Sequence, residues 1–161
     1  MKIFLDMDQV LVDFYAGTKA ILGYDWETKT GDPIEEAGRN KQIVGPTFWQ
    51  ELPPMPDYME LWEFVRPYDP YILSATPCWK DPYVYVGKRA WIQRYLQIPQ
   101  ERIHIVNRTD KHIFAYHGEE QNLLIDDRKD NVEHFIQAGG LGILHIDAVS
   151  TVSQLKNILN R

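Results

Sequence analysis

Acidic side chains follow two short apolar runs of the chain and indicate a site that binds a cation or transfers a proton. Asp6 and Asp8 follow the first run, and Asp126 and Asp127 follow a later one. Apolar runs of this length are typical of buried strands. Neighbouring carboxylates at a strand end are unfavourable unless a cation or a proton-transfer role compensates for their charge. Taken alone, the first pair is also consistent with an acidic turn, and the second with the start of a helix.

A hydroxyl group and a lysine also stand at the end of an apolar run or in the segment after it. Ser74 ends a second apolar run, Thr76 lies just beyond it, and Lys111 lies in the segment after a third run. In open sheets of parallel strands, ligands bind at the carboxyl ends of the strands. Because all these polar groups fall at or beyond such an end, their joint occurrence favours one functional site over several unrelated surface residues.

Short apolar runs alternate with helix-like stretches along most of the chain. The predicted strands span residues 2–6, 71–74, 103–106, 122–126 and 142–146, and the predicted helices span 60–65, 84–96, 131–138 and 152–159. We expect Ser150 or Thr151 to cap the last helix, whose apolar stripe includes Val152 and Leu155. The alternation predicts an α/β fold, a Rossmann-like three-layer α/β/α core with a mostly parallel sheet.

One segment, 15–56, does not fit this alternation. It is rich in Gly, Lys, Glu and Trp, it contains no clean strand, and it is too long for a plain connection. We interpret it as a small helical cap inserted after strand 1, with the proline-rich stretch 53–56 as a stiff return to the core. The predicted division is therefore a core of residues 1–14 and 57–161 and a cap of residues 15–56.

The polar motifs and their order resemble the haloacid-dehalogenase-like phosphatase superfamily. Asp-Met-Asp-Gln-Val at 6–10 is similar to the first signature of this superfamily, and the strand that ends at Ser74 is similar to the second. Lys111 is similar to the third signature, and Leu-Ile-Asp-Asp at 124–127 to the fourth. The order and rough spacing of the four motifs cover most of the chain.

A narrower resemblance is to the 5'(3')-deoxyribonucleotidases. It rests on the opening segment 6–14, on Phe-Trp-x-x-Leu-x-Pro-x-Pro at 48–56, on Lys-x-x-Trp-Ile at 88–92, on Arg-Thr-Asp-Lys at 108–111 and on Leu-Leu-Ile-Asp-Asp-Arg-x-Asp at 123–130. The chain departs from that family at three places. Gln9 stands where the family usually has Gly, the interval from Lys111 to Asp126 is longer than usual, and segment 25–41 is not matched residue by residue. These departures concern the choice of substrate and not the phosphatase class.

The charge of the substrate explains the cofactor that the resemblance implies. A phosphate monoester is a dianion that repels a carboxylate nucleophile, so a divalent cation must bridge the two, and Mg²⁺ prefers such oxygen ligands. The resemblance implies that Asp6 is a metal ligand and the nucleophile that forms an aspartyl-phosphate. It implies Asp126 as the second carboxylate ligand and the backbone carbonyl of Asp8 as a further ligand. Asp127 would orient a metal-bound water.

The side chain of Asp8 carries the prediction of hydrolysis. It can protonate the leaving ester oxygen and then deprotonate the water that attacks the intermediate. Ser74 is expected to donate a hydrogen bond to a phosphoryl oxygen, and Lys111 to place a positive charge on the phosphoryl group. Lys88 is a candidate for a second phosphate contact, with a solvated helix lysine as the alternative.

Three aromatic residues are candidates for the substrate pocket. Phe14, Phe48 and Trp49 have rings that can stack on a nucleobase, but they fit equally well as packing between cap and core. Tyr15 and Trp26 are weaker candidates for the same role.

The composition excludes several other functions. The net charge of −6 at pH 7 provides no basic surface for stable binding of nucleic acid or of an anionic membrane. No run approaches the roughly 18 apolar residues of a membrane span, and Asp6 and Asp8 interrupt the first run, which argues against a signal peptide. The single cysteine, Cys78, permits no internal disulfide and favours a reducing compartment, so we expect a cytoplasmic protein.

The sequence thus predicts a Mg²⁺-dependent phosphatase whose partner is a small-molecule nucleotide, preferably a deoxynucleoside monophosphate. A sugar phosphate or the 3'-phosphate end of a nucleic acid is an alternative substrate. A non-catalytic module that binds Mg²⁺ or phosphate is an alternative function, although a pure binder has no use for the acid/base at Asp8. The oligomeric state is left open, with a homodimer as one option.

Overall fold

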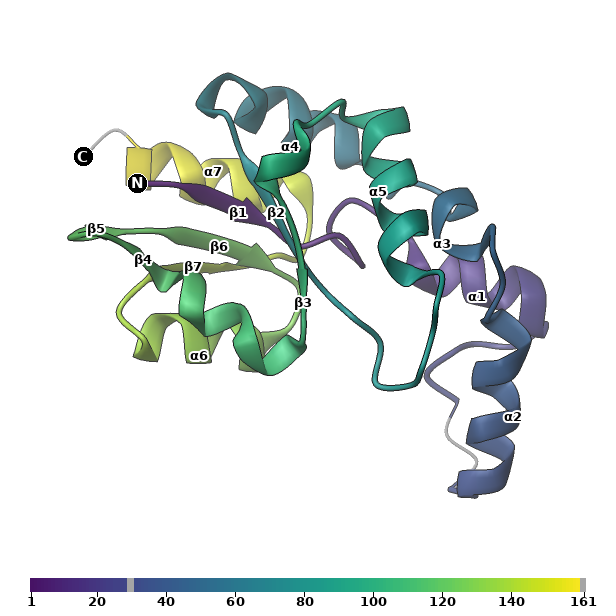
Figure 1. Cartoon of the computed structure of the whole chain (residues 1–161). Helices are drawn as coiled ribbons and strands as arrows, with labels where there is room; N and C mark the ends of the chain where they lie inside the picture. Colours follow the sequence, from purple (N-terminus) through teal and green to yellow (C-terminus); the bar gives the residue numbers. More distant parts are fainter. Residues whose placement is uncertain (29–30, 160–161) are drawn as a thin grey trace.

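The computed structural model describes residues 1–28 and 31–159 and contains a five-stranded parallel sheet between two helical layers (Figure 1). The strands are β1 (Ile3–Leu5), β2 (Tyr71–Ala75), β3 (Ile103–Val106), β6 (Leu123–Asp126) and β7 (Leu141–Leu144). Their order in the sheet is β3-β2-β1-β6-β7, and each neighbouring pair is parallel. The predicted α/β fold is therefore confirmed.

The alternation of side chains along β1 explains the two helical layers. Ile3 and Leu5 belong to the larger core cluster, and Phe4 belongs to a second cluster. The larger cluster packs under α4 (Tyr58–Val65), α5 (Val84–Tyr95) and α7 (Ala148–Leu159). The second packs under the 3₁₀ helix η3 (Arg108–Ala115) and α6 (Lys129–Gln137), and Figure 1 shows α7 and α6 on opposite sides of the sheet. Successive strand residues point to opposite faces, so both faces are apolar and covered.

The remaining elements are short. They are the 3₁₀ helices η1 (Arg66–Tyr68) and η2 (Gln100–Arg102) and the two strands of a small hairpin, β4 (Tyr116–His117) and β5 (Glu120–Gln121). The hairpin, which occupies the long interval between Lys111 and Asp126, was not expected from the sequence. Among the helices of the described ranges, none combines the length and the apolar character that crossing a bilayer requires.

The start of α7 differs from the expectation. The helix begins at Ala148, so Ser150 and Thr151 lie inside its first turn and do not cap it. Asp147 Oδ1 accepts a hydrogen bond from Ser150 N at 2.7 Å, and Asp57 Oδ2 accepts one from Ala148 N at 2.7 Å. The predicted cap was wrong because Asp147, directly before the helix, and Asp57, from a distant segment, accept the hydrogen bonds of the first backbone amides of α7. The fifth strand also ends earlier than expected, at Leu144.

Segment 15–56 contains most of α1 (Phe14–Leu22) and all of α2 (Pro33–Ile43) and α3 (Phe48–Glu51), and its other described residues form connections between them. These helices lie beyond the carboxyl ends of the strands, and α2 is the farthest from the sheet (Figure 1). The proline-rich return is fixed to the turn after β1, because Asp13 N donates to Pro53 O and Met55 N donates to Leu11 O. The boundaries of the predicted cap stay a prediction.

A glycine allows α5 to approach α3 closely and gives a test of this packing. A Cβ atom on Gly87 would lie 2.5 Å from Trp49 Cβ and 3.4 Å from Gln50 N. We expect Gly87→Ala to lower the free energy of unfolding by about 1–3 kcal/mol, because the helices must separate. Urea denaturation measures the change. Gly38→Ala in α2 is the matched control, since nothing lies within 4 Å of its Cβ, and it should stabilise the protein by about 0.5–1 kcal/mol. Equal effects of the two substitutions would contradict the close contact.

Candidate active site

Three neighbouring strands bring the predicted polar residues to one edge of the sheet. Asp6 directly follows β1, Ser74 lies near the end of β2, and Asp126 is the last residue of β6. Strand β1 is central, with β2 on one side and β6 on the other. The site therefore lies where the chain order reverses across the sheet, which is where open α/β sheets bind ligands.

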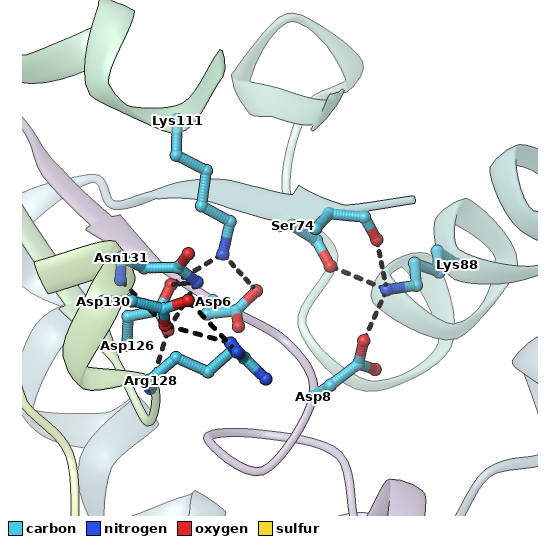
Figure 2. Close-up of polar contacts among 10 residues, drawn as sticks. Asp6, Asp8, Ser74, Lys88, Lys111, Asp126, Arg128, Asp130 and Asn131 are labelled. Carbon is cyan, nitrogen blue, oxygen red and sulfur yellow. Dashed lines mark hydrogen bonds and ion pairs between the residues drawn. The ribbon is translucent and has the colours of Figure 1, made fainter. Parts of the chain in front are cut away.

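Lys111 connects the carboxylates of the first and fourth motifs (Figure 2). Its Nζ lies 2.9 Å from Asp6 Oδ1 and 2.7 Å from Asp126 Oδ2, and the lysine is almost completely buried. Burial opposes the charge on the ammonium group, but these two carboxylates outweigh it and raise the pKa of Lys111. Lys111 is thus a fixed positive charge beside Asp6.

Asp126 is held by neighbours on α6 and on the turn before it. Asn131 Nδ2 donates to both carboxylate oxygens of Asp126, at 3.0 and 2.9 Å, and Arg128 N donates to Oδ1 at 2.9 Å. Arg128 in turn forms a two-point ion pair with Asp130 at 3.1 Å. These contacts fix the orientation of Asp126. The role of Asn131 was missed in the sequence, although its place five residues after Asp126 puts it in the first turn of the following helix.

Lys88 forms a second polar cluster with Asp8 and Ser74 (Figure 2). Its Nζ donates to Asp8 Oδ2 at 2.7 Å, to Ser74 Oγ at 2.8 Å and to Ala75 O at 3.0 Å, and it lies 4.7 Å from the ring of Trp49. The side chain is completely buried, so the solvated-lysine alternative is wrong. All three donors of the ammonium group are engaged, so Lys88 is a partner of Asp8 and Ser74 here, and its contact with a phosphate stays a prediction.

The environment of Asp8 suits an acid that gives and takes a proton. Burial raises its pKa, Lys88 lowers it, and the nearby charge of Asp6 raises it, with an increase as the net result. Asp8 lines the cavity described below, with 31% of its side chain exposed, and its Oδ1 atom is buried without a hydrogen-bond partner. Ser74 Oγ accepts the bond from Lys88, and the side chain of Ser74 is completely buried beneath the wall formed by Ala75 and Thr76, so its contact with a phosphate stays a prediction.

Three carboxylates lie close enough to share one cation. Asp6, Asp126 and Asp127 each offer an oxygen, and these atoms lie within 4.8 Å of one another. Asp6 Oδ1 is buried and has the ion pair with Lys111 but no well-formed hydrogen bond. Burial and the other carboxylates raise the pKa of Asp126 to about 6 and that of Asp127 to about 8. Three crowded carboxylates supply the oxygen ligands that a hard divalent cation such as Mg²⁺ prefers.

The pKa of Asp127 predicts how the stability of the metal-free protein depends on pH. Folded Asp127 keeps its proton up to about pH 8, whereas the ordinary value is 3.8. The folded state binds more protons between these values, so its free energy of unfolding falls as the pH rises through this window. We expect Asp127→Asn to be more stable than the parent at pH 8 by at least about 1 kcal/mol, or roughly 2–4 °C in melting temperature.

Thermal unfolding in EDTA at pH 5 and pH 8 measures this difference. Because a bound cation relieves the repulsion among the carboxylates, Mg²⁺ should raise the melting temperature of the parent more at pH 8 than at pH 5. Asp25→Asn, in an exposed ion pair with Lys19, is the matched control and should retain the slope of the parent. The same slope in Asp127→Asn as in the parent would contradict the assignment.

A cavity of about 510 Å³ opens above these groups. It is lined by Asp6, Asp8, Lys111 and Asp127, and by residues from the segments after β1, β2 and β3, and its size is typical of small-molecule sites. The lining also includes Thr76 and Arg108, which lie in motifs that the sequence had already indicated, and Trp79 and Asn107, which it had not. Trp79 and Asn107 lie in the segments after β2 and β3, so their position beyond a strand end was the available signal.

The aromatic candidates separate into two groups. Phe14 and Trp49 line the cavity and stack at 5.9 Å with an interplanar angle of 22°. Trp49 is further fixed by a hydrogen bond from Nε1 to Asp81 Oδ2 at 2.6 Å. Phe48 does not line the cavity but packs edge-on against Phe14 and Trp49, which corrects the prediction for this residue. It sits one residue before Trp49 on a short helix and therefore faces another direction.

The two weaker candidates do line the cavity. Tyr15 and Trp26 are both part of its wall, and Trp26 contacts Trp79 with ring centroids 5.6 Å apart. The guanidinium of Arg39 lies 4.0 Å above the ring of Trp26. The aromatic wall is thus larger than the sequence suggested, because loops that are distant in the sequence meet there.

Comparison with known proteins places this geometry in context. No protein-family model matches the chain. The chain is 30% identical over 130 residues to the "Putative 5'(3')-deoxyribonucleotidase" of Vibrio phage KVP40, and the alignment covers 80% of this chain and 67% of that protein. Among solved structures, a hydrolase from Streptococcus pneumoniae TIGR4 superposes with a TM-score of 0.56 at 14% identity, over 99% of this chain and 98% of that one. The likeness to the streptococcal hydrolase, at 14% identity, shows that the two proteins share a fold.

Proposed function

The chain belongs to the 5'(3')-deoxyribonucleotidase family of haloacid-dehalogenase-like phosphatases, and we propose that it hydrolyses (deoxy)nucleoside monophosphates with Mg²⁺ as cofactor. The name of the phage relative supports the class of substrate. The observation that carries the proposal is the presence of Asp6 and Asp8 in the same cavity, each with its own buried lysine. The aromatic wall around Phe14, Trp26 and Trp79 offers rings on which a flat base can stack.

Asp6 and Asp126 would hold the Mg²⁺ ion, with the backbone carbonyl of Asp8 as a further ligand. Asp127 would accept a hydrogen bond from a water on the ion. The bound ion would supply positive charge that offsets the repulsion between the Asp6 carboxylate and the phosphate dianion.

In the first step, a carboxylate oxygen of Asp6 attacks the phosphorus atom and the bond from phosphorus to the ester oxygen breaks. Asp8, in its protonated form, gives its proton to that oxygen, so the nucleoside leaves as a neutral alcohol. Lys111 stabilises the charge of the phosphoryl oxygens, and Ser74 would donate a hydrogen bond to one of them. Asp6 then carries the phosphoryl group as an aspartyl-phosphate.

In the second step, Asp8 acts as a base. Its carboxylate takes a proton from a water molecule, and the resulting nucleophile attacks phosphorus and breaks the bond to Asp6. Inorganic phosphate leaves, the Asp6 carboxylate is restored and Asp8 is protonated again. Lys88 keeps the Asp8 side chain in place through both steps, because its contacts with Ser74 and Ala75 anchor the ammonium group.

Phosphate release from a panel of substrates tests the proposal. The panel contains nucleoside 5'- and 3'-monophosphates in deoxy and ribo forms, several sugar phosphates and a 3'-phosphorylated oligonucleotide, each with Mg²⁺ and with EDTA. We expect release with Mg²⁺ only, and faster release from the deoxynucleotides.

The other outcomes discriminate among the alternatives. Release from a sugar phosphate or the oligonucleotide alone would retain the catalytic residues and discard the nucleotide as substrate. Undiminished release in EDTA would discard the metal. No release from any substrate by folded protein would favour the non-catalytic binding module.

A further inference from the structure

Gln9 occupies an unusual backbone position directly after Asp8. Its φ of 60° lies in the left-handed region, which residues other than glycine rarely adopt. The turn that imposes this conformation is tightly bonded, because Gln9 N donates to Val12 O at 2.7 Å and Val12 N donates to Met7 O at 2.9 Å. Glycine would fit here without strain, so a glutamine at this position needs a compensating role for its side chain.

The side chain of Gln9 supplies hydrogen bonds to the start of α1. Its amide satisfies its neighbours when the oxygen faces the helix, where it accepts from Phe14 N and Tyr15 N at 3.0 Å each. Phe14 N also reaches Val12 O at 3.1 Å, so Tyr15 N is the amide that depends most on Gln9. Asp13, the residue before the helix, accepts from Ala16 N at 2.8 Å. Helix α1 therefore has two side-chain caps, and only Gln9 comes from the turn that carries Asp8.

The two residues that Gln9 holds belong to the wall of the active-site cavity. Phe14, Tyr15 and Gln9 all line it, together with Asp8, whereas Asp13 does not. The leaving group of a substrate must lie beside Asp8, because Asp8 gives it a proton. A shift of α1 against this turn would move the rings of Phe14 and Tyr15 relative to that leaving group.

The geometry points to Gln9 as a positioning residue that fixes the first turn of α1 against the turn bearing Asp8, and so sets the part of the cavity that receives the leaving group. The inference rests on the proposed function for the identity of the leaving group. The hydrogen bonds of Gln9 do not depend on that function. Two measurements therefore test the positioning role of Gln9 and the identity of the substrate separately.

The first measurement is amide hydrogen exchange followed by NMR. Gln9→Gly keeps the left-handed turn free of strain and removes only the side chain, so we expect exchange at Tyr15 N to rise about fivefold with Ala16 N unchanged. Asp13→Ala is the matched control and should have the reverse pattern. Gln9→Glu retains an accepting oxygen and should restore the protection of Tyr15 N. Unchanged exchange at Tyr15 N in Gln9→Gly would overturn the inference whatever the substrate is.

The second measurement compares a large and a small leaving group. The ratio of kcat/KM for the best nucleoside monophosphate to kcat/KM for ethyl phosphate should fall about five- to tenfold in Gln9→Gly, mainly through KM for the nucleotide. Asp13→Ala should leave this ratio within about twofold. Equal ratios in the two variants would overturn the positioning role. If the parent hydrolyses no nucleotide, the proposed function fails, and the exchange experiment alone decides the role of Gln9.

Discussion

Asp6→Asn is expected to release phosphate at least about 10⁴-fold more slowly than the parent, because an amide cannot replace a carboxylate as nucleophile. The amide has nearly the same shape, and Lys111 retains Asp126 as a partner. The loss should appear in kcat for every substrate that the parent hydrolyses. Phosphate release in the presence of saturating Mg²⁺ measures it.

The same variant should remain folded, and this separates chemistry from stability. The charge of Asp6 raises the pKa values of Asp126 and Asp127, so its removal relieves repulsion in the buried cluster. We expect a melting temperature in EDTA equal to or above that of the parent. Asp69→Asn, an exposed carboxylate paired with Arg102, is a control for the same chemical change and should retain full activity. Activity of Asp6→Asn within tenfold of the parent would remove Asp6 from the role of nucleophile.

Asp8→Asn is expected to slow turnover of a nucleotide by about 10²- to 10⁴-fold, the usual contribution of general acid–base catalysis. Asparagine has no proton to give to the leaving oxygen and cannot take one from water. Both steps should therefore slow, unlike in Asp6→Asn, where the first step is lost. Single-turnover and steady-state rates of phosphate release measure the two effects.

The leaving group provides the sharper test of Asp8. A nitrophenolate leaves without a proton, so formation of the aspartyl-phosphate from 4-nitrophenyl phosphate should be much less impaired than formation from a nucleotide. The second step still lacks its base, and we expect a burst of nitrophenolate followed by slow turnover. Equal losses for the two leaving groups, without a burst, would show that Asp8 acts other than as the acid.

The sequence predicted the fold and the centre of the cavity because both depend on local patterns. The apolar runs before Asp6, Ser74 and Asp126 are short and bounded by polar residues, which is typical of buried parallel strands. Parallel pairing then brings their carboxyl ends to one edge, so residues that are distant in the sequence become neighbours. The catalytic roles of these residues remain predictions that the variants above test.

Other features depend on contacts that no local pattern contains. The sequence left Lys88 open as a site residue or a surface lysine, and its burial depends on the approach of Trp49 on α3 to α5 at Gly87. Phe48 and Trp49 are adjacent aromatic residues, and only the packing of α3 decides which of them reaches the cavity. The sequence shows that Gln9 replaces the glycine usual in the family. Its hydrogen bonds to α1, however, depend on the left-handed turn at Gln9, which only the structure shows.

The two buried lysines have a consequence for how a substrate reaches the cavity. When fully ionised, the four carboxylates of the site and its two ammonium groups leave two negative charges, which one divalent ion balances. With the ion bound, the proton that Asp8 carries in the first step and the charge of Arg108 in the cavity wall make the site itself positive, whereas the chain as a whole carries a charge of −6. An anionic nucleotide diffuses toward a surface of like charge, so added salt should speed its capture by screening that repulsion. Retention then depends on short-range contacts inside the cavity.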